Sequence, residues 1–357
     1  MLAALSAGCG DEGGDPRCDV PDGAGPAVDP TGAWCERLSS YRLFDDVAAQ
    51  RPADGVIPYD LNTPLFSDYT VKQRFLWVPP GESLAWQPTD AFEAPPGTVV
   101  IKTFGYLADR RDPSAGRRLL ETRLLVRGED GWSGAAYVYD EADPSDARLA
   151  LAGTTLDASW IHDDGTAREN AHAVPNKNQC KNCHAERDDT IQLLGPKARH
   201  LNRPGPDGTG IADQLQHLVD EGVLTGAPPP AEWPRAPVAT DPSTGSLDER
   251  ARAWLDINCA HCHNPRGPAR TSGLYLDLAQ TEPAAFGVCK PPVAAGRGSG
   301  GRRYGIVPGE PDASILVFRL ESTEPDIRMP ELGRNLVDAE GNALIREWIA
   351  SMPGSCP

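Results

Sequence analysis

The chain of 357 residues is poor in positive charge, in methionine and in long apolar segments. Beyond its first residues no stretch is apolar enough to span a bilayer as a helix. Its 34 Lys and Arg residues face 51 Asp and Glu residues, which gives a net charge of −17. That balance argues against nucleic acid or an anionic membrane surface as a partner. It suits protein partners with basic docking faces, or it simply keeps a secreted chain soluble.

Two familiar kinds of catalytic signature are also missing. The glycine-rich stretch at 296–301 lacks the strand–GxxxxGK–helix context of a phosphate-binding loop. The strand-rich first half contains no nucleophile–base set. Glycine and proline, by contrast, are abundant at 36 and 35 residues. Much of the chain should therefore be loop.

The pattern C-x-x-C-H occurs twice, at 180–184 and at 259–263. It is the attachment signature of c-type haem, in which two thiols form thioethers and the histidine binds iron. A zinc site would usually need a second ligand pair, and each motif stands alone in the sequence. A thioredoxin-like pair would need a βαβ context and no final histidine. We therefore expect two covalent haems, held by Cys180, Cys183 and His184 and by Cys259, Cys262 and His263.

The small number of methionines limits the choice of a sixth iron ligand. The chain has three, Met1, Met329 and Met352. Met329 precedes Pro330 in a loop-like stretch, so we predict that it binds the second iron, where a thioether raises the reduction potential. The first haem then has no methionine. Its candidate ligands are His200 and His217, followed by His172, His162 and Lys197, and an open iron is the alternative.

A basic, glycine-rich stretch at 289–304 lies inside this acidic protein. Its arginines, Arg297, Arg302 and Arg303, are candidates for bidentate pairing with haem propionates. A solvated loop is the competing interpretation.

Haem attachment of this type implies an oxidising, extracytoplasmic compartment. Residues 1–8 resemble a bacterial lipoprotein signal segment and Cys9 its lipidated cysteine, and an ordinary secretory signal is the alternative. Residues 9–33 then read as a disordered tether, which predicts a periplasmic or outer-membrane-anchored lipoprotein. Cys18, Cys35, Cys289 and Cys356 allow three pairings, of which 18–35 with 289–356 is the simplest.

Strand signals dominate residues 34–171, notably at 98–106, 118–126 and 132–139. Residues 172–245 hold the first haem motif and a short helical run at 212–224. In residues 246–357, Ser246 and Glu249 form a capping-box pattern and Asp338 can cap a second helix. We expect a multidomain chain, with an N-terminal antiparallel β sandwich-like domain followed by mostly α cytochrome c-type haem domains.

Several stretches resemble a bacterial family of secreted two-haem c-type cytochromes, over nearly the full chain after Trp34. They are the segments at 59–68, 116–123, 174–180, 195–199 and 258–303. The order of helix, haem motif, Met-Pro loop and terminal helix in residues 246–357 is similar to class I cytochrome c, in which that methionine is the distal ligand.

The resemblance implies extracytoplasmic electron transfer through two haems and leaves the partner unnamed. The alternative is a peroxidase-like redox enzyme in which the first haem is open. The lack of a recognisable distal acid–base set favours the electron carrier.

Overall fold

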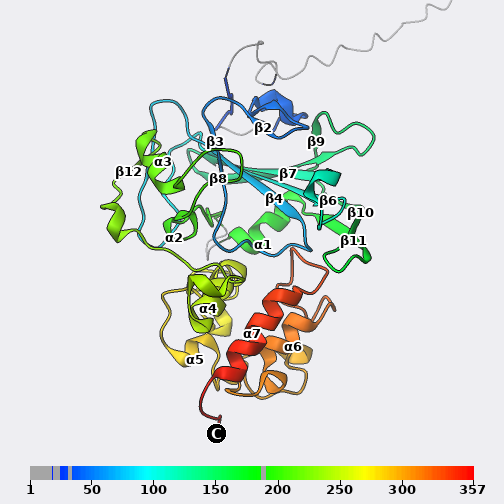
Figure 1. The fold of residues 1–357 in the computed structure, drawn as a ribbon, viewed down its shortest axis with the longest axis vertical. Helices are drawn as coiled ribbons and strands as arrows, with labels where there is room; N and C mark the ends of the chain where they lie inside the picture. The colour runs from blue at the N-terminus through cyan, green and yellow to red at the C-terminus, as the bar shows by residue number, and fades with distance from the viewer. Residues whose placement is uncertain (1–17, 19–24, 31–33, 186–189) are drawn as a thin grey trace, which may run out of the picture.

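The computed structural model describes residues 18, 25–30, 34–185 and 190–357. A six-stranded antiparallel sheet forms one half of the molecule, and the last four α helices form the other (Figure 1). Helix α1, with the first haem motif, lies between the two halves.

The large sheet has the strand order β3-β4-β6-β7-β8-β9. Its strands are β3 Val56–Tyr59, β4 Val71–Trp77, β6 Val99–Leu107, β7 Arg117–Gly128, β8 Gly131–Tyr139 and β9 Ala147–Leu149. Three small sheets accompany it: β1 Phe44–Asp46 with β2 Arg51–Pro52, β10 Thr154–Ile161 with β11 Ala167–Val174, and the parallel pair β5 Leu84–Ala85 with β12 Leu224–Thr225. The predicted strands at 98–106, 118–126 and 132–139 are confirmed as β6, β7 and β8.

Alternation along the strands gives the large sheet two unlike faces. One face presents a row of apolar side chains, Phe75, Ile101, Leu124 and Ala135, to a core that includes Leu38 and Leu43. The opposite face is apolar at one end, where α2 and α3 cover it, and at the other end, where Tyr106 stacks on Trp160 of β10. Elsewhere that face carries charged side chains and lies against the first haem motif.

Among the described residues seven α helices occur, most of them short. They are α1 Lys181–His184, α2 Ala198–Leu201, α3 Gln214–Asp220, α4 Leu247–Asn258, α5 Pro283–Phe286, α6 Ile315–Glu321 and α7 Ala339–Ser351. Short 3-10 helices lie at Leu38–Tyr41, Pro113–Ala115, Lys177–Cys180, Pro230–Glu232, Pro242–Thr244, Arg270–Ser272, Gly296–Ser299 and Pro311–Ala313.

The two longest helices begin at the predicted caps. Ser246 and Glu249 form a reciprocal capping box at the start of α4, and Asp338 accepts a hydrogen bond from the backbone N–H of Gly341 at the start of α7. These caps satisfy donors that the first turn of a helix leaves unpaired. Helix α4 delivers the chain directly to Cys259.

The expected fold class, a β sandwich-like domain followed by mostly α haem domains, is wrong. The described chain is β-rich, and its large sheet is covered on the second face by loops, short helices and the two-stranded β10–β11 hairpin instead of a second large sheet. Residues 246–357 contain only four α helices, of which α5 has four residues and α6 seven. Frequent glycine and proline end the helices early and leave long connections between them.

One segment, residues 60–70, fastens the sheet to the rest of the molecule. Asn62 donates to the carbonyls of Arg199 and Ala236, and the backbone N–H of Phe66 donates to Asn258 on α4. Asp68, which is 3 % exposed, accepts hydrogen bonds from the backbone N–H groups of Asn335 and Leu336. The parts of the chain that the sequence suggested as separate units therefore share buried polar contacts.

Candidate functional site

The two C-x-x-C-H motifs lie side by side, although they are 79 residues apart in sequence (259 minus 180). Cys183 of the first motif and His261 and Cys262 of the second offer ligand atoms that all lie within 4.8 Å of one another. The Cys262 Sγ is also 3.9 Å from the Asn182 carbonyl oxygen. The motifs thus stand alone in the sequence but together in the fold, so their isolation no longer argues against a zinc site.

The oxidation state divides the described cysteines into two groups. Cys18–Cys35 and Cys289–Cys356 form disulfides, which confirms the simplest of the three pairings. Cys180, Cys183, Cys259 and Cys262 are unpaired thiols. All four thiols needed for thioether attachment are therefore available, and Cys9 lies outside the described residues.

Each motif histidine has one ring nitrogen engaged and the other without a hydrogen bond to a described residue. His184 Nδ1 lies 2.9 Å from the Gln192 carbonyl oxygen, to which it donates. His263 Nδ1 lies 3.2 Å from Ser272 Oγ, whose own proton goes to the Ala269 carbonyl. Iron-binding histidines are typically oriented by a hydrogen bond of this kind, which leaves Nε2 for the metal.

Burial disfavours the charged form of both rings. Burial lowers the pKa of His184 below its ordinary value. Burial, with smaller effects of His261 and Arg319, lowers the pKa of His263 to about 4. A metal ligand must be the neutral imidazole, so these environments suit iron ligation. The donor set of two thiols and one neutral imidazole at each motif fits c-type haem.

The loop that carries Met329 is fixed near the second motif. The backbone N–H of Met329 donates to the Arg319 carbonyl at 3.0 Å, and Arg334 donates to the Met329 carbonyl at 2.9 Å. Met329 borders a small pocket together with Trp254 and Asn258 on α4, the helix that leads to Cys259. Ligation of the second iron by Met329 stays a prediction.

The candidate ligands of the first iron are engaged elsewhere. His200 is 2 % exposed, and its Nε2 lies 2.7 Å from Asp256, which also binds Arg199 through two contacts of 2.9 Å. His172 Nε2 lies 2.7 Å from Glu121, and His162 Nδ1 accepts from Trp160. These bonds hold the three rings in structural networks.

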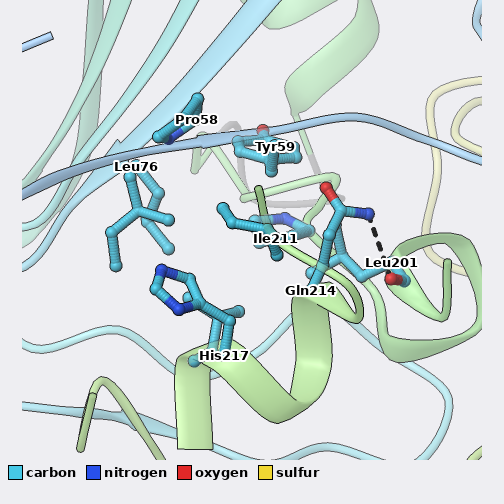
Figure 2. Close-up of a pocket in the computed structure, with 10 residues that line it drawn as sticks. Pro58, Tyr59, Leu76, Leu201, Ile211, Gln214 and His217 are labelled. Atoms are coloured by element: carbon cyan, nitrogen blue, oxygen red, sulfur yellow. Dashed lines mark hydrogen bonds between the residues drawn. The ribbon is translucent and has the colours of Figure 1, made fainter. Parts of the chain in front are cut away.

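His217 lies on α3 at the border of a small apolar pocket. Figure 2 shows its ring facing Leu76 and Ile211 across that pocket. The pocket opens on the α2–α3 end of the sheet, among residues of a separate apolar cluster. The structure therefore does not choose a sixth ligand for the first iron from these histidines and Lys197, and an iron without a sixth ligand stays an alternative.

The three arginines of the glycine-rich stretch are on the surface. Arg297, whose side chain is 70 % exposed, lies 2.9 Å from Glu324 and 3.8 Å from Asp326. Arg302 lies over the Phe318 ring and donates to the Asp312 carbonyl, and Arg303 lies over the Tyr304 ring. Their proposed pairing with propionates stays a prediction.

Several residues around the site could not be found from the sequence. Gln192 and Ser272 orient the two histidines from eight and nine residues downstream. Arg123 and Lys102, on adjacent strands, lie close enough to the first motif for their charges to influence its thiols and histidine. Only the register of the sheet reveals the last two.

No family model, no curated protein and no solved structure matches this chain. Among the described residues, no helix combines the length and apolarity that crossing a membrane requires.

Proposed function

We propose that the protein is a two-haem c-type cytochrome that transfers electrons outside the cytoplasm. The observation that carries the proposal is the pair of C-x-x-C-H motifs side by side, each with two free thiols and an oriented, neutral histidine. Cys180, Cys183 and His184 would hold one haem, and Cys259, Cys262 and His263 the other. When bound, haem iron supplies a one-electron couple between Fe(III) and Fe(II).

The chain's own residues would orient the groups. Gln192 and Ser272 fix the two imidazole rings, and the two attachment sites are adjacent in the fold. Adjacent sites suit a relay, in which an electron enters at one site and leaves from the other. The net charge of −17 favours redox partners with basic faces.

The proposed location is the periplasm or the outer membrane. Two disulfides are what an oxidising compartment permits. A lipid at Cys9 would attach the protein to the membrane. Partitioning of the native protein into the detergent phase, lost in Cys9→Ser, tests that anchor. A lipoprotein cysteine carries two or three acyl chains, which bind a membrane stably where one chain alone binds only marginally.

A single metal ion held by Cys183, His261 and Cys262 is the competing proposal, because their ligand atoms are close enough together. It leaves unexplained why His184 and His263 are both oriented with Nε2 available. A peroxidase-like enzyme is the second alternative, with the first haem open. It would need an acid–base group over that haem, and the nearby His172 and His200 are each bonded to a carboxylate.

The test is the mass and the pyridine haemochrome spectrum of the denatured protein from a host that matures c-type cytochromes. Two haems that survive denaturation are expected. Cys180→Ala/Cys183→Ala and Cys259→Ala/Cys262→Ala should each retain one haem. A protein that carries zinc and no covalent haem supports the single-metal proposal instead. Rapid turnover of hydrogen peroxide by the two-haem protein supports the enzyme.

A further inference from the structure

The charged face of the large sheet carries a row of cations in register. Arg74 on β4 pairs with Lys102 on β6, and Lys102 pairs with Arg123 on β7. Lys72 lies on the same face of β4, two residues from Arg74. Like charges directly opposite each other on neighbouring strands destabilise a sheet. In a protein with a net charge of −17, such a row calls for an explanation.

The carboxylates on this face do not balance the row. Asp60 accepts from Arg74 at 3.0 Å, and Glu121 makes two bonds of 2.9 and 2.6 Å with Arg123. Lys102 makes no hydrogen bond or ion pair with the described residues, and its ammonium lies over the Phe104 ring. Lys72 donates only to the Thr70 carbonyl.

Arg74 also has a buried donor that lacks an acceptor among the described residues. Its side chain is 4 % exposed, and its Nη2 is buried without a hydrogen-bond partner. Burial and the charges of Arg74, Lys72 and Arg123 lower the pKa of Lys102 well below its ordinary value. A buried charge of this kind is costly unless an anion pairs with it.

The row begins beside the first haem motif and leads away from it. A Cβ added at Gly134 on β8 would lie 3.7 Å from the Cys180 Sγ, so that thiol lies against this face. Strands are spaced by about 4.8 Å, so the row reaches Arg74 on β4 about 10 Å beyond Arg123 on β7. In a haem the propionates lie on the porphyrin edge opposite the vinyl groups that bind cysteine.

We propose that this row is the binding site for the carboxylates of the first haem, with Lys102 and Arg74 as their principal cationic partners. The inference rests on the proposed function and extends it to a site that the sequence did not indicate. The haem carboxylates would pair with the Lys102 ammonium and with the buried Nη2 of Arg74. Cations that pair with propionates also stabilise the reduced haem, whose iron has one positive charge fewer, and so raise its reduction potential.

Lys102→Met is the most informative variant, because Lys102 has no partner that the change would leave unpaired. If the lysine were only structural, its removal would leave both reduction potentials unchanged. We expect two covalent haems, a negative shift in the potential of one haem and no shift in the other, measured by spectroelectrochemistry. Lys102→Arg should keep the potentials near those of the wild type, and Arg51→Met removes one positive charge from an exposed side chain on β2 as a control.

Two retained haems with both potentials unchanged in Lys102→Met would overturn the inference and leave the proposed function standing. An equal shift in Arg51→Met would also overturn it, since the effect would then be one of net charge. Absence of covalent haem from the wild-type protein would refute the proposed function, and this inference with it.

Discussion

A single buried residue can fix a loop on which a proposed haem site depends. Asp68 is the clearest case, because it is buried and accepts hydrogen bonds from Asn335, Leu336 and the Asn170 side chain. It thereby ties the stretch that follows Met329 to the sheet. The 59–68 segment attracted attention in the sequence through a family resemblance, but these partners of the Asp68 side chain are more than 100 residues away and could not be read from it.

Asp68→Asn should destabilise the protein by about 3 kcal/mol, because hydrogen bonds to a charged group contribute about 1.5–3 kcal/mol and an amide presents a donor to backbone donors. Denaturant unfolding measures the difference. Asp163→Asn is the control, since Asp163 is half-exposed in its pair with Arg110 and should cost less than about 1 kcal/mol. Equal costs for the two variants would contradict this role of Asp68.

Met329 supports a prediction about ligation. If its thioether binds the second iron, oxidised protein shows one sulfur–iron charge-transfer band for two haems, and Met329→His abolishes it. The potential of one haem should also fall, because imidazole is the stronger donor to Fe(III). Met352→Leu is the matched control and should keep the band. Persistence of the band in Met329→His would transfer the assignment to Met352.

The surroundings of Glu121 predict that the stability difference between the wild type and a Glu121 variant depends on pH. Burial alone would raise its pKa, but Arg123 and the hydrogen bond from His172 outweigh burial and lower it to about 2. A carboxyl whose pKa is depressed on folding contributes stability above its unfolded pKa, and that contribution is lost as pH falls towards the folded pKa.

Glu121→Gln should therefore be less stable than the wild type near pH 7 by up to about 3 kcal/mol. The gap should close between about pH 4.5 and pH 2. Unfolding free energies of both proteins across this range give the measurement. A gap that is constant with pH would mean that Glu121 is not ionised in the folded protein.

At the scale of elements, the sequence was most informative where structure is local. The caps at Ser246 and Asp338 and the strands β6, β7 and β8 follow from short patterns, and the structure has them. The second face of the sheet did not follow from such patterns. Alternation along β4 and β6 identifies two faces, but only the register aligns Arg74, Lys102 and Arg123.

The crossing of α4 and α7 gives an element-scale prediction. A Cβ at Gly341 would meet the Trp254 indole and the Asp338 carboxylate, so the two helices approach too closely for a side chain there. Gly341→Ala should destabilise the protein by about 1–3 kcal/mol through overpacking, even though alanine is the better helix former.

Thermal unfolding of Gly341→Ala tests the crossing, and Ala343→Gly, at an exposed position of α7, calibrates helix propensity at about 1 kcal/mol. Stabilisation of the protein by Gly341→Ala would show that the helices are not in close contact.

For the whole molecule, the central feature is the meeting of two motifs that the chain keeps 79 residues apart (259 minus 180). The sequence identified both motifs and the donor chemistry of each. It could not bring them together, because their proximity depends on long-range contacts such as those of Asn62 and Phe66 with residues 199, 236 and 258. The expected fold class, a sandwich-like domain followed by mostly α haem domains, was wrong because the described chain is β-rich and most of its helices are short.

Circular dichroism in the Soret region tests the central claim most directly, because two adjacent haems couple and two distant haems do not. The wild-type spectrum should be a two-signed couplet that differs from the sum of the spectra of Cys180→Ala/Cys183→Ala and Cys259→Ala/Cys262→Ala. A wild-type spectrum equal to that sum would contradict the account of two haems held side by side.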